Sequence, residues 1–244
     1  MKKNIIIILN IFKRTNPTTA LKVSILFILN KLFFPRMRLS FSQFGEDLII
    51  ENLINKKKGI YVDVGCNDSI NGNNFFKLYL LGWNGICIDG NENVLKNYHI
   101  IRPKDKVVNE LISEKEKELV FYISEDDKVS TGSEAQFQIA KEKWKFNDTN
   151  KKYLKTKTLT QILDKHLDSK FPIDVLSIDV EGMDYEVLLG LNFKKYSPKL
   201  IIIELGELDM MNIEDNNIYK LLFNNGYKFI SQNFITSFFL KNEE

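Results

Sequence analysis

Residues 59–68 read Gly-Ile-Tyr-Val-Asp-Val-Gly-Cys-Asn-Asp. An apolar, β-branched run ends in Asp63, and Gly65 follows two residues later, ahead of a small polar loop. This order is typical of a buried parallel strand whose following loop lets a nucleotide-like ligand approach the backbone. The stretch therefore predicts an α/β protein with a ligand site at the carboxyl edge of a parallel sheet.

Two further strands are predicted to end in acids. Residues 85–89 read Gly-Ile-Cys-Ile-Asp and end at Asp89. Residues 173–182 read Ile-Asp-Val-Leu-Ser-Ile-Asp-Val-Glu-Gly and carry Asp179 and Glu181. Because the carboxyl ends of parallel strands meet at one edge of a sheet, we expect these carboxylates to gather in a single site.

Strands and helices alternate along the chain. Apolar runs predict strands over residues 60–64, 85–89, 106–112, 119–123, 173–179, 200–204, 227–230 and 234–240, with 119–123 as the hairpin partner of 106–112. Capping signals and helical spacing predict helices from Ser42 and over residues 74–81, 91–101, 158–166, 183–189 and 214–224. Together they predict a Rossmann-like, seven-stranded and mostly parallel sheet. Helices cover both faces, and the last strand, part of a C-terminal hairpin, is antiparallel.

The first forty residues differ from the rest in charge. They contain eight lysines and arginines and no acid, whereas the whole chain has a net charge of +2, so residues 41–244 carry −6. The apolar stretch 20–34 is interrupted by Lys22 and Lys31, and it falls short of the roughly 20 apolar residues that a membrane span needs. Residues 1–40 are therefore expected to form a helical extension. Two interpretations stay open: it docks on the domain or on a partner subunit, or it anchors the protein at an anionic membrane surface.

Residues 124–156 form an expected insertion with little apolar periodicity. The sequence is compatible with a solvated excursion and with a lid over the site.

Cys66 and Cys87 are expected to be buried, reduced thiols, which favours a cytoplasmic protein. If the extension is a membrane anchor, the protein is expected at the inner face of the membrane. There is no Cys-x-x-Cys motif, and the two histidines are far apart in the sequence, so no metal site is expected.

The glycine pattern of the first loop discriminates between cofactors. A pyrophosphate dinucleotide needs Gly-x-Gly-x-x-Gly so that the backbone can meet its phosphates. Here only Gly65 is a glycine, and Asn67 and Ser69 occupy the later small positions. Asp89, 26 residues after Asp63, is placed to accept hydrogen bonds from two ribose hydroxyls. These features favour a nucleoside ligand without phosphate, such as S-adenosylmethionine.

Several stretches in order resemble the FkbM-type family of S-adenosylmethionine-dependent methyltransferases. They are residues 42–47 (SQFGED), 62–67 (VDVGCN), 82–89 (GWNGICID), 158–163 (TLTQIL) and 178–190 (IDVEGMDYEVLLG). The resemblance implies a class I methyltransferase domain over residues 41–244, with residues 124–156 as an insertion. It also implies methyl transfer to an oxygen, often a sugar hydroxyl, in glycan or natural-product pathways. The sequence departs from the family at Asp89, where glutamate is frequent, and at Cys66, where alanine is frequent.

Site residues are expected at the strand tips. The candidates for binding the cofactor are Asp63, Gly65, Asn67, Asp89 and Gln43, with the backbone near Leu111 and Ile112 against adenine. Asp47 is a further candidate beside Gln43. The candidates for catalysis are Asp179 and Glu181, one of which accepts a proton, or both of which fix acceptor hydroxyls or a divalent cation. Alternatively, Asp179 closes a turn and Glu181 favours the dipole of the following helix. Glu204 is expected beside the acceptor.

The function favoured by the sequence is O-methylation of a sugar, a glycan or a related small metabolite. A nicotinamide-dependent oxidoreductase is an alternative, which the missing glycines oppose. A non-catalytic module tethered by its basic N-terminus is a second alternative, although the motif carboxylates Asp63, Asp89 and Asp179 are present. Nucleic acid is not an expected partner, because no basic stripe lies outside the extension.

Overall fold

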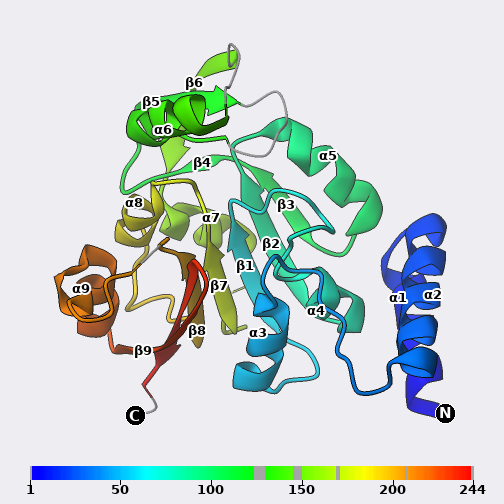
Figure 1. Cartoon of the computed structure of the whole chain (residues 1–244). Helices are drawn as coiled ribbons and strands as arrows, with labels where there is room; N and C mark the ends of the chain where they lie inside the picture. Colours follow the sequence, from blue (N-terminus) through cyan, green and yellow to red (C-terminus); the bar gives the residue numbers. More distant parts are fainter. Residues whose placement is uncertain (1, 124–129, 145–149, 169–170, 207, 243–244) are drawn as a thin grey trace.

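A computed structural model describes residues 2–123, 130–144, 150–168, 171–206 and 208–242 (Figure 1). The helices are α1 (Lys2–Arg14), α2 (Pro17–Phe33), α3 (Glu46–Ile54), α4 (Phe76–Leu81), α5 (Glu92–Ile101), α6 (Glu134–Trp144), α7 (Leu159–His166), α8 (Asp184–Leu189), the short 3-10 helix η1 (Ile213–Asp215) and α9 (Asn217–Asn224). The strands are β1 (Ile60–Val64), β2 (Asn84–Asp89), β3 (Lys106–Asn109), β4 (Leu111–Ile112), β5 (Glu118–Ile123), β6 (Asn150–Lys157), β7 (Val175–Ile178), β8 (Leu200–Glu204), β9 (Tyr227–Asn233) and β10 (Thr236–Lys241).

The main sheet has seven strands in the order β3-β2-β1-β7-β8-β10-β9. Strand β10 runs antiparallel to both β8 and β9, and the remaining strands are parallel to one another. This confirms the predicted architecture. Val64 pairs with Ile88 of β2 and with Ile178 of β7, so the chain leaves β1, β2 and β7 at one level of the same edge.

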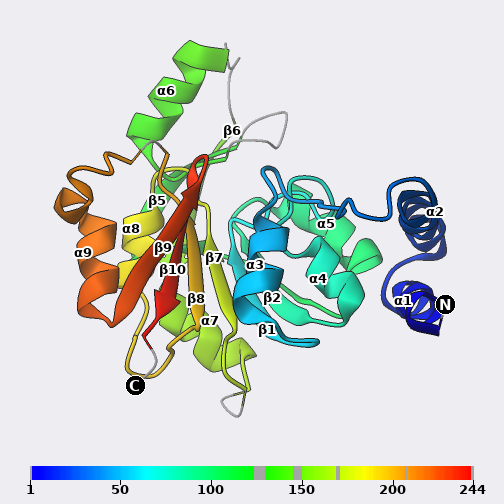
Figure 2. The ribbon, with the colours of Figure 1, turned by 60° about the horizontal axis from the view of Figure 1, so that its bottom comes forward.

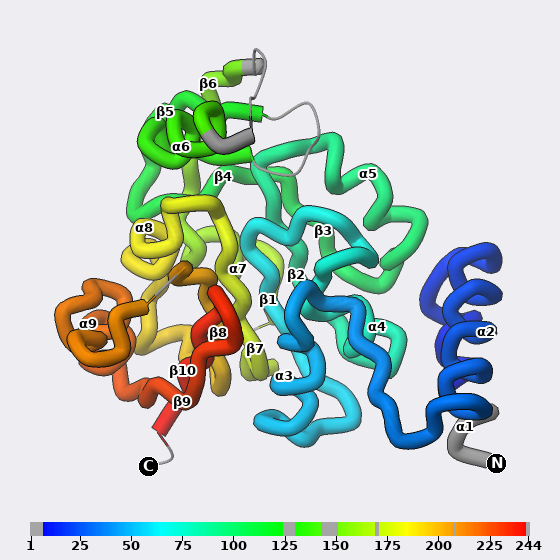
Figure 3. Tube along the Cα trace, viewed as in Figure 1, coloured from blue at the N-terminus to red at the C-terminus, as the bar shows by residue number. Residues whose placement is uncertain are grey.

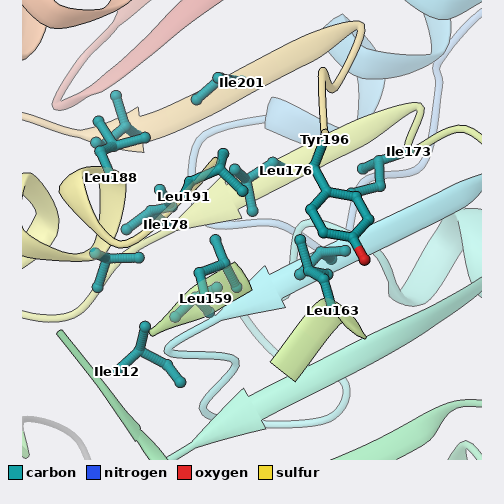
Figure 4. Packing of buried hydrophobic residues seen from close by; sticks show 14 of the residues in the cluster. Ile112, Leu159, Leu163, Ile173, Leu176, Ile178, Leu188, Leu191, Tyr196 and Ile201 are labelled. Carbon is teal, nitrogen blue, oxygen red and sulfur yellow. The ribbon is translucent and has the colours of Figure 1, made fainter. Parts of the chain in front are cut away.

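Each face of the sheet has its own hydrophobic core. On one face, Val62, Val64 and Ile178 pack with residues of α7, α8 and α9, and Figure 4 shows part of this cluster around Leu159, Leu163 and Leu188. On the other face, the cluster includes residues of β1, β2 and β8 together with α3, α4 and α5. Because side chains alternate along each strand, successive residues contribute to the two cores in turn. The rigid layers between them fix the positions of the strand ends.

Most described helix ends follow their sequence signals, although α4 and α9 begin two and three residues later than predicted. Thr158 and Gln161 form a capping box at the start of α7, and Gly82 ends α4 in the left-handed conformation, as predicted. The helix expected from Ser42 begins later, because Gly45 is the N-cap of α3. The Ser42 hydroxyl still accepts a hydrogen bond from the backbone N–H of Asp47, at 3.2 Å.

A second sheet, in the order β4-β6-β5, corrects two predictions. The strand expected over 106–112 is divided, so that β3 belongs to the main sheet and β4 to the small one. The hairpin expected between residues 106–112 and 119–123 is wrong, because β5 pairs with β6 of the insertion. The described part of the insertion is also more regular than expected, since it contains α6 and β6. The sequence Asn-Lys-Lys-Tyr-Leu-Lys-Thr-Lys of β6 lacks an apolar alternation, because one side of the strand is mostly exposed and the other buries only Leu154, in part, and the polar Thr156.

The N-terminal extension docks on the domain through α1. Ile11 is fully buried against α4, together with Ala20 and Val23 of α2. The Asn10 side chain donates a hydrogen bond of 2.8 Å to the backbone oxygen of Leu80, and Arg14 donates to the backbone oxygen of Trp83. Figures 2 and 3 show α1 and α2 side by side at one edge of the molecule, next to α4. Among the described residues, no helix has the length and apolar character needed to cross a membrane.

Candidate active site

A cavity opens where β1, β2 and β7 end, with an empty volume of about 630 Å³ that includes solvent at its mouth. Seven residues predicted for the site line it: Gly65, Asn67, Asp89, Leu111, Ile112, Asp179 and Glu181. They come from four separate segments of the sequence. The structure places these residues around one cavity, which we call the cofactor cavity.

Gly65 is required where the first loop crosses the end of β7. Its φ angle is 79°, and a Cβ atom built on it would lie 1.7 Å from the backbone oxygen of Asp179. Its N–H donates a hydrogen bond of 2.9 Å to the backbone oxygen of Ile88. No L side chain fits this approach. The glycine therefore joins the ends of three strands, in addition to opening the backbone toward the cavity.

A buried arginine supports the loop after β1. Arg102 donates hydrogen bonds to Asn73 Oδ1 at 2.8 Å and to the Tyr61 hydroxyl at 2.7 Å, and it forms an ion pair with Asp105 at 2.8 Å. Asn73 in turn donates to the backbone oxygens of Cys66 and Asp68, at 3.2 and 3.0 Å. Arg102 is not recognisable from the sequence as a site residue, because a single arginine at the end of a helix matches no motif. Its full burial and its partners identify it as a positioning residue for the loop.

Asp89 lies at the rim of the first loop. Its carboxylate accepts hydrogen bonds from the backbone N–H of Asn67 at 3.2 Å and of Asn91 at 2.8 Å. These bonds hold the two loops that follow β1 and β2. A carboxylate offers about four acceptor positions, so the same group can also accept hydrogen bonds from the adjacent hydroxyls of a ribose. The geometry at Asp89 thus suits a nucleoside.

The opposite wall of the cavity is apolar. Leu111, Ile112 and Phe121 line it, and a Cβ atom built on Gly90 would lie 3.0 Å from the Phe121 ring. The absence of a side chain at Gly90 thus lets this wall pack directly on the backbone after β2, and an apolar wall of this kind suits one face of a flat aromatic base. The described residues that line the cavity include four acids, Asp89, Glu110, Asp179 and Glu181, and no lysine or arginine. This charge suits a ligand that carries a sulfonium and an ammonium group, and it opposes a pyrophosphate.

Three predicted or considered residues lie elsewhere. Asp63 shares its strand face with Tyr61 and is buried behind the cavity; desolvation raises its pKa to about 7 despite Arg102 and Asn73 nearby. Gln43 is exposed and lines neither this cavity nor the second one described below. Asp47 is fully buried, and its carboxylate accepts hydrogen bonds from the Ser40 hydroxyl and from the N–H of Phe41. The structure therefore places neither Gln43 nor Asp47 at the cofactor cavity.

The loop after β7 presents Asp179 and Glu181 to the cavity. Glu181 has a φ angle of 53°, a left-handed conformation that is uncommon for a side chain other than glycine. Asp184 closes the turn by accepting hydrogen bonds from the N–H groups of Val180 and Gly182, both at 3.2 Å. The turn-closing role considered for Asp179 therefore belongs to Asp184.

The described part of the insertion holds Glu181 from the other side. The Gln136 side chain donates to its carboxylate at 3.3 Å, and the Thr131 hydroxyl donates to its backbone oxygen at 2.7 Å. The ring of Phe137 stacks on Tyr122 with centroids 4.1 Å apart and fixes α6 to the small sheet. Ser130 and Gly132 line the cofactor cavity. Residues 130–137 thus form a wall of the site, whereas residues 124–129 and 145–149 of the expected lid lie outside the described residues.

A second cavity adjoins the first and shares Asp179 and Glu181 with it. Its other lining residues are mostly polar or acidic: Gln136, Gly182, Asp184, Tyr185, Glu204, Leu205, Gly206, Asn216 and Ile218. The position of Glu204 agrees with its expected place beside an acceptor. We call this space the acceptor cavity. The two shared carboxylates lie at the junction between the cavities.

Burial and mutual repulsion keep protons on these acids. Burial, followed by the neighbouring charges of Glu204 and Glu181, raises the pKa of Asp179 well above its usual range. Burial and the charge of Glu181 raise the pKa of Glu204 to about 7. Burial also raises the pKa of Asp184 to about 6. Asp179 and Glu204 therefore form an interacting carboxyl pair in which both pKa values are raised above their usual range.

The thiols and histidines take no part in this geometry. Cys66 and Cys87 are buried, as expected, and are not joined in a disulfide. Among the described residues, no group of three or more histidines, cysteines and acids has the arrangement of a metal site.

A comparison with known protein families identifies the family of the chain. The sequence profile of the methyltransferase FkbM domain matches residues 63–229. Among solved structures, the chain is similar to a TehB-like SAM-dependent methyltransferase from Corynebacterium glutamicum, with 9% sequence identity, a TM-score of 0.40, and coverage of 93% of this chain and 100% of that one. A comparison with curated protein sequences gives no match. The chain belongs to the FkbM methyltransferase domain family, and it is a methyltransferase whose cofactor is S-adenosylmethionine.

Proposed function

We propose that the protein transfers the methyl group to a hydroxyl of a sugar, a glycan or a related small metabolite. The observation that carries this proposal is the position of Asp179 and Glu181, which line the cofactor cavity and the acceptor cavity at once. Among the described residues, Asp179 and Glu181 are the lining residues that the two cavities share. The two carboxylates therefore flank the path between donor and acceptor.

The lining of the acceptor cavity favours a neutral, hydroxyl-bearing acceptor. Four acids, with Gln136 and Asn216, provide many hydrogen-bond acceptors for O–H groups. Those acids that are ionised at neutral pH, such as Asp184 with a pKa of about 6, repel a carboxylate or a phosphate, since like charges brought together without solvent are costly. Acceptors that carry a carboxylate, which would become a methyl ester, and acceptors that carry a phosphate are thus disfavoured.

The chain's residues orient the acceptor and remove its proton. When bound, S-adenosylmethionine supplies an electrophilic methyl group on a sulfonium sulfur. Asp89 and the wall at Leu111 and Ile112 fix the nucleoside, so that its reactive end faces the loop after β7. The ionised form of the Asp179–Glu204 pair would accept the proton that the acceptor hydroxyl loses when its oxygen is methylated. Alignment of this kind supplies part of the roughly 7–11 kcal/mol available from orientation.

A labelling experiment tests the proposal. The full chain is incubated with S-adenosylmethionine labelled in its methyl group and with glycans extracted from the cell envelope, and the products are treated with mild alkali. We expect alkali-stable label on a sugar oxygen, because ethers resist conditions that cleave esters. The Asp179→Asn variant serves as the inactive control. Alkali-labile label, or label on nitrogen, would contradict O-methylation of a hydroxyl while leaving the methyltransferase assignment intact.

A further inference from the structure

The outer face of α2 is apolar and is not covered by the described protein. Leu21, Ile25, Ile28 and Leu32 follow one another at helical spacing and are 46–69% exposed. Leu26, Leu29 and Phe33 form a second exposed row beside them. An ordinary surface helix presents polar residues to solvent. Contiguous apolar faces of this kind mark a site of interaction.

The exposed face belongs to a helix that is held in place. Ala20, Val23 and Ser24 on the opposite side of α2 are buried, and Phe27 packs with Ile11 and residues of α4. Asn16 caps the helix by accepting a hydrogen bond from the N–H of Thr19 at 2.9 Å. Helix α2 thus lies along the edge of the domain with its outer face directed away from it (Figure 2).

The apolar surface continues beyond the helix and is flanked by cations. Phe34 and Met37 are exposed, at 58% and 64%. Lys22, Lys31 and Arg36 are exposed, and no ion pair found among the described residues involves them. Arg38, by contrast, is paired with Glu51 at 2.8 Å. We call the outer residues of α2, together with Phe34, Arg36 and Met37, the basic apolar face.

We propose that the basic apolar face binds the surface of an anionic phospholipid bilayer, with α2 lying in the plane of the interface. Apolar side chains enter the boundary between headgroups and acyl chains, and long cationic side chains reach the lipid phosphates. The charge is complementary, since residues 1–40 contain eight cations and no acid. A symmetric dimer through the same face would bring Lys22, Lys31 and Arg36 against their equivalents, which opposes self-association.

Flotation of the full chain tests this proposal. The protein is mixed with vesicles of phosphatidylcholine alone, or of equal parts phosphatidylcholine and phosphatidylglycerol, and centrifuged through a density gradient. We expect flotation with the anionic vesicles and loss of flotation as salt is raised. The test variants are an apolar one, Ile28→Ser with Leu32→Ser and Phe33→Ser, and a charge one, Lys22→Glu with Lys31→Glu and Arg36→Glu. We expect each to lower the vesicle partition coefficient by about tenfold or more.

Matched control variants remove equally exposed residues from other parts of the surface. The apolar control is Met211→Ser with Phe223→Ser, and the charge control is Lys194→Glu with Lys220→Glu and Lys228→Glu. The controls are expected to float like the wild type. Circular dichroism and binding of S-adenosylhomocysteine verify that every variant is folded.

Two results would overturn the proposal. One is a wild-type chain that stays at the bottom of the gradient with anionic vesicles, or an apolar variant that floats as well as the wild type. The other is a wild-type dimer in sedimentation velocity that the apolar variant converts to a monomer without any flotation, which would identify a second copy as the occupant of the face. Neither result bears on the chemistry at Asp179.

Discussion

Replacement of Asp89 by alanine is the sharpest perturbation of the cofactor cavity. In the account given above, the carboxylate accepts hydrogen bonds from two ribose hydroxyls in addition to those from the N–H groups of Asn67 and Asn91. Hydrogen bonds to a charged group contribute about 1.5–3 kcal/mol each. Loss of the two ribose bonds therefore costs about 3–6 kcal/mol, which weakens binding by about 10²- to 10⁴-fold.

Isothermal titration with S-adenosylhomocysteine measures this loss. Asp89→Asn keeps one oxygen acceptor and is expected to fall between the wild type and Asp89→Ala. Glu92→Gln removes a negative charge from the exposed start of α5, outside the cavity lining, and is the matched control. We expect it to bind within about twofold of the wild type, since exposed charges contribute little.

A modified ligand separates ribose recognition from a disturbed loop. S-adenosylhomocysteine that lacks the ribose 2′-hydroxyl is expected to bind the wild type more weakly than the parent ligand. In Asp89→Ala this difference between the two ligands should largely disappear, because the group that senses the hydroxyl is gone. A folded Asp89→Ala variant that binds S-adenosylhomocysteine as tightly as the wild type would refute the assignment.

Three further predictions concern the rest of the site. Asp179→Asn is expected to bind S-adenosylhomocysteine normally and to lose about 10²- to 10⁴-fold in turnover; equal losses in binding and turnover would contradict its place at the junction. Because the pKa values of Asp179 and Glu204 are raised, the latter to about 7, kcat is expected to rise with pH through about 7, and Glu204→Gln should move the midpoint lower; a flat profile from about pH 5 to about pH 9 would contradict the carboxyl pair. Arg102→Leu strands the buried Asp105 carboxylate and is expected to lower the unfolding free energy in urea by about 3–5 kcal/mol; a loss below about 1 kcal/mol would contradict its role as the support of the loop.

The raised pKa values also set the sign of the pH dependence of stability. The pKa of Glu204 is about 7 in the folded protein, whereas the ordinary value of an unburied glutamate is 4.5. Between these two values the folded state holds a proton that the unfolded chain has released. The unfolding free energy contributed by this group is therefore present at low pH and falls as pH rises through about 7. Calorimetric unfolding of the wild type and of Glu204→Gln measures the difference, which should shrink toward low pH.

The sheet and most of the cavity could be predicted because they follow from local patterns. Each strand of the main sheet is a short apolar run, and parallel strands place their last residues at one edge. Asp89, Asp179 and Glu181 therefore converge for a reason that is visible in the sequence, whereas Leu111 belongs to β4 of the small sheet. The match at these positions is a consequence of topology, which fixes strand ends more firmly than it fixes side-chain direction.

The remaining features depend on contacts between distant segments. Asp63 is at the predicted strand end, but the alternation along β1 turns it toward the layer of Asn73 and Arg102, behind the cavity. Gln43 precedes a helix whose start is set by Gly45 and by the buried Asp47, and this leaves Gln43 exposed. The contact between Gln136 and Glu181 joins residues 45 positions apart. No local periodicity of the sequence predicts contacts between such distant residues.

A crystal structure of the full chain with S-adenosylhomocysteine is the decisive experiment for the site. We expect the adenine against Leu111 and Phe121, both ribose hydroxyls on the Asp89 carboxylate, and the sulfur facing the junction at Asp179 and Glu181. A nucleoside bound elsewhere, or one whose sulfur points away from the acceptor cavity, would contradict this expectation.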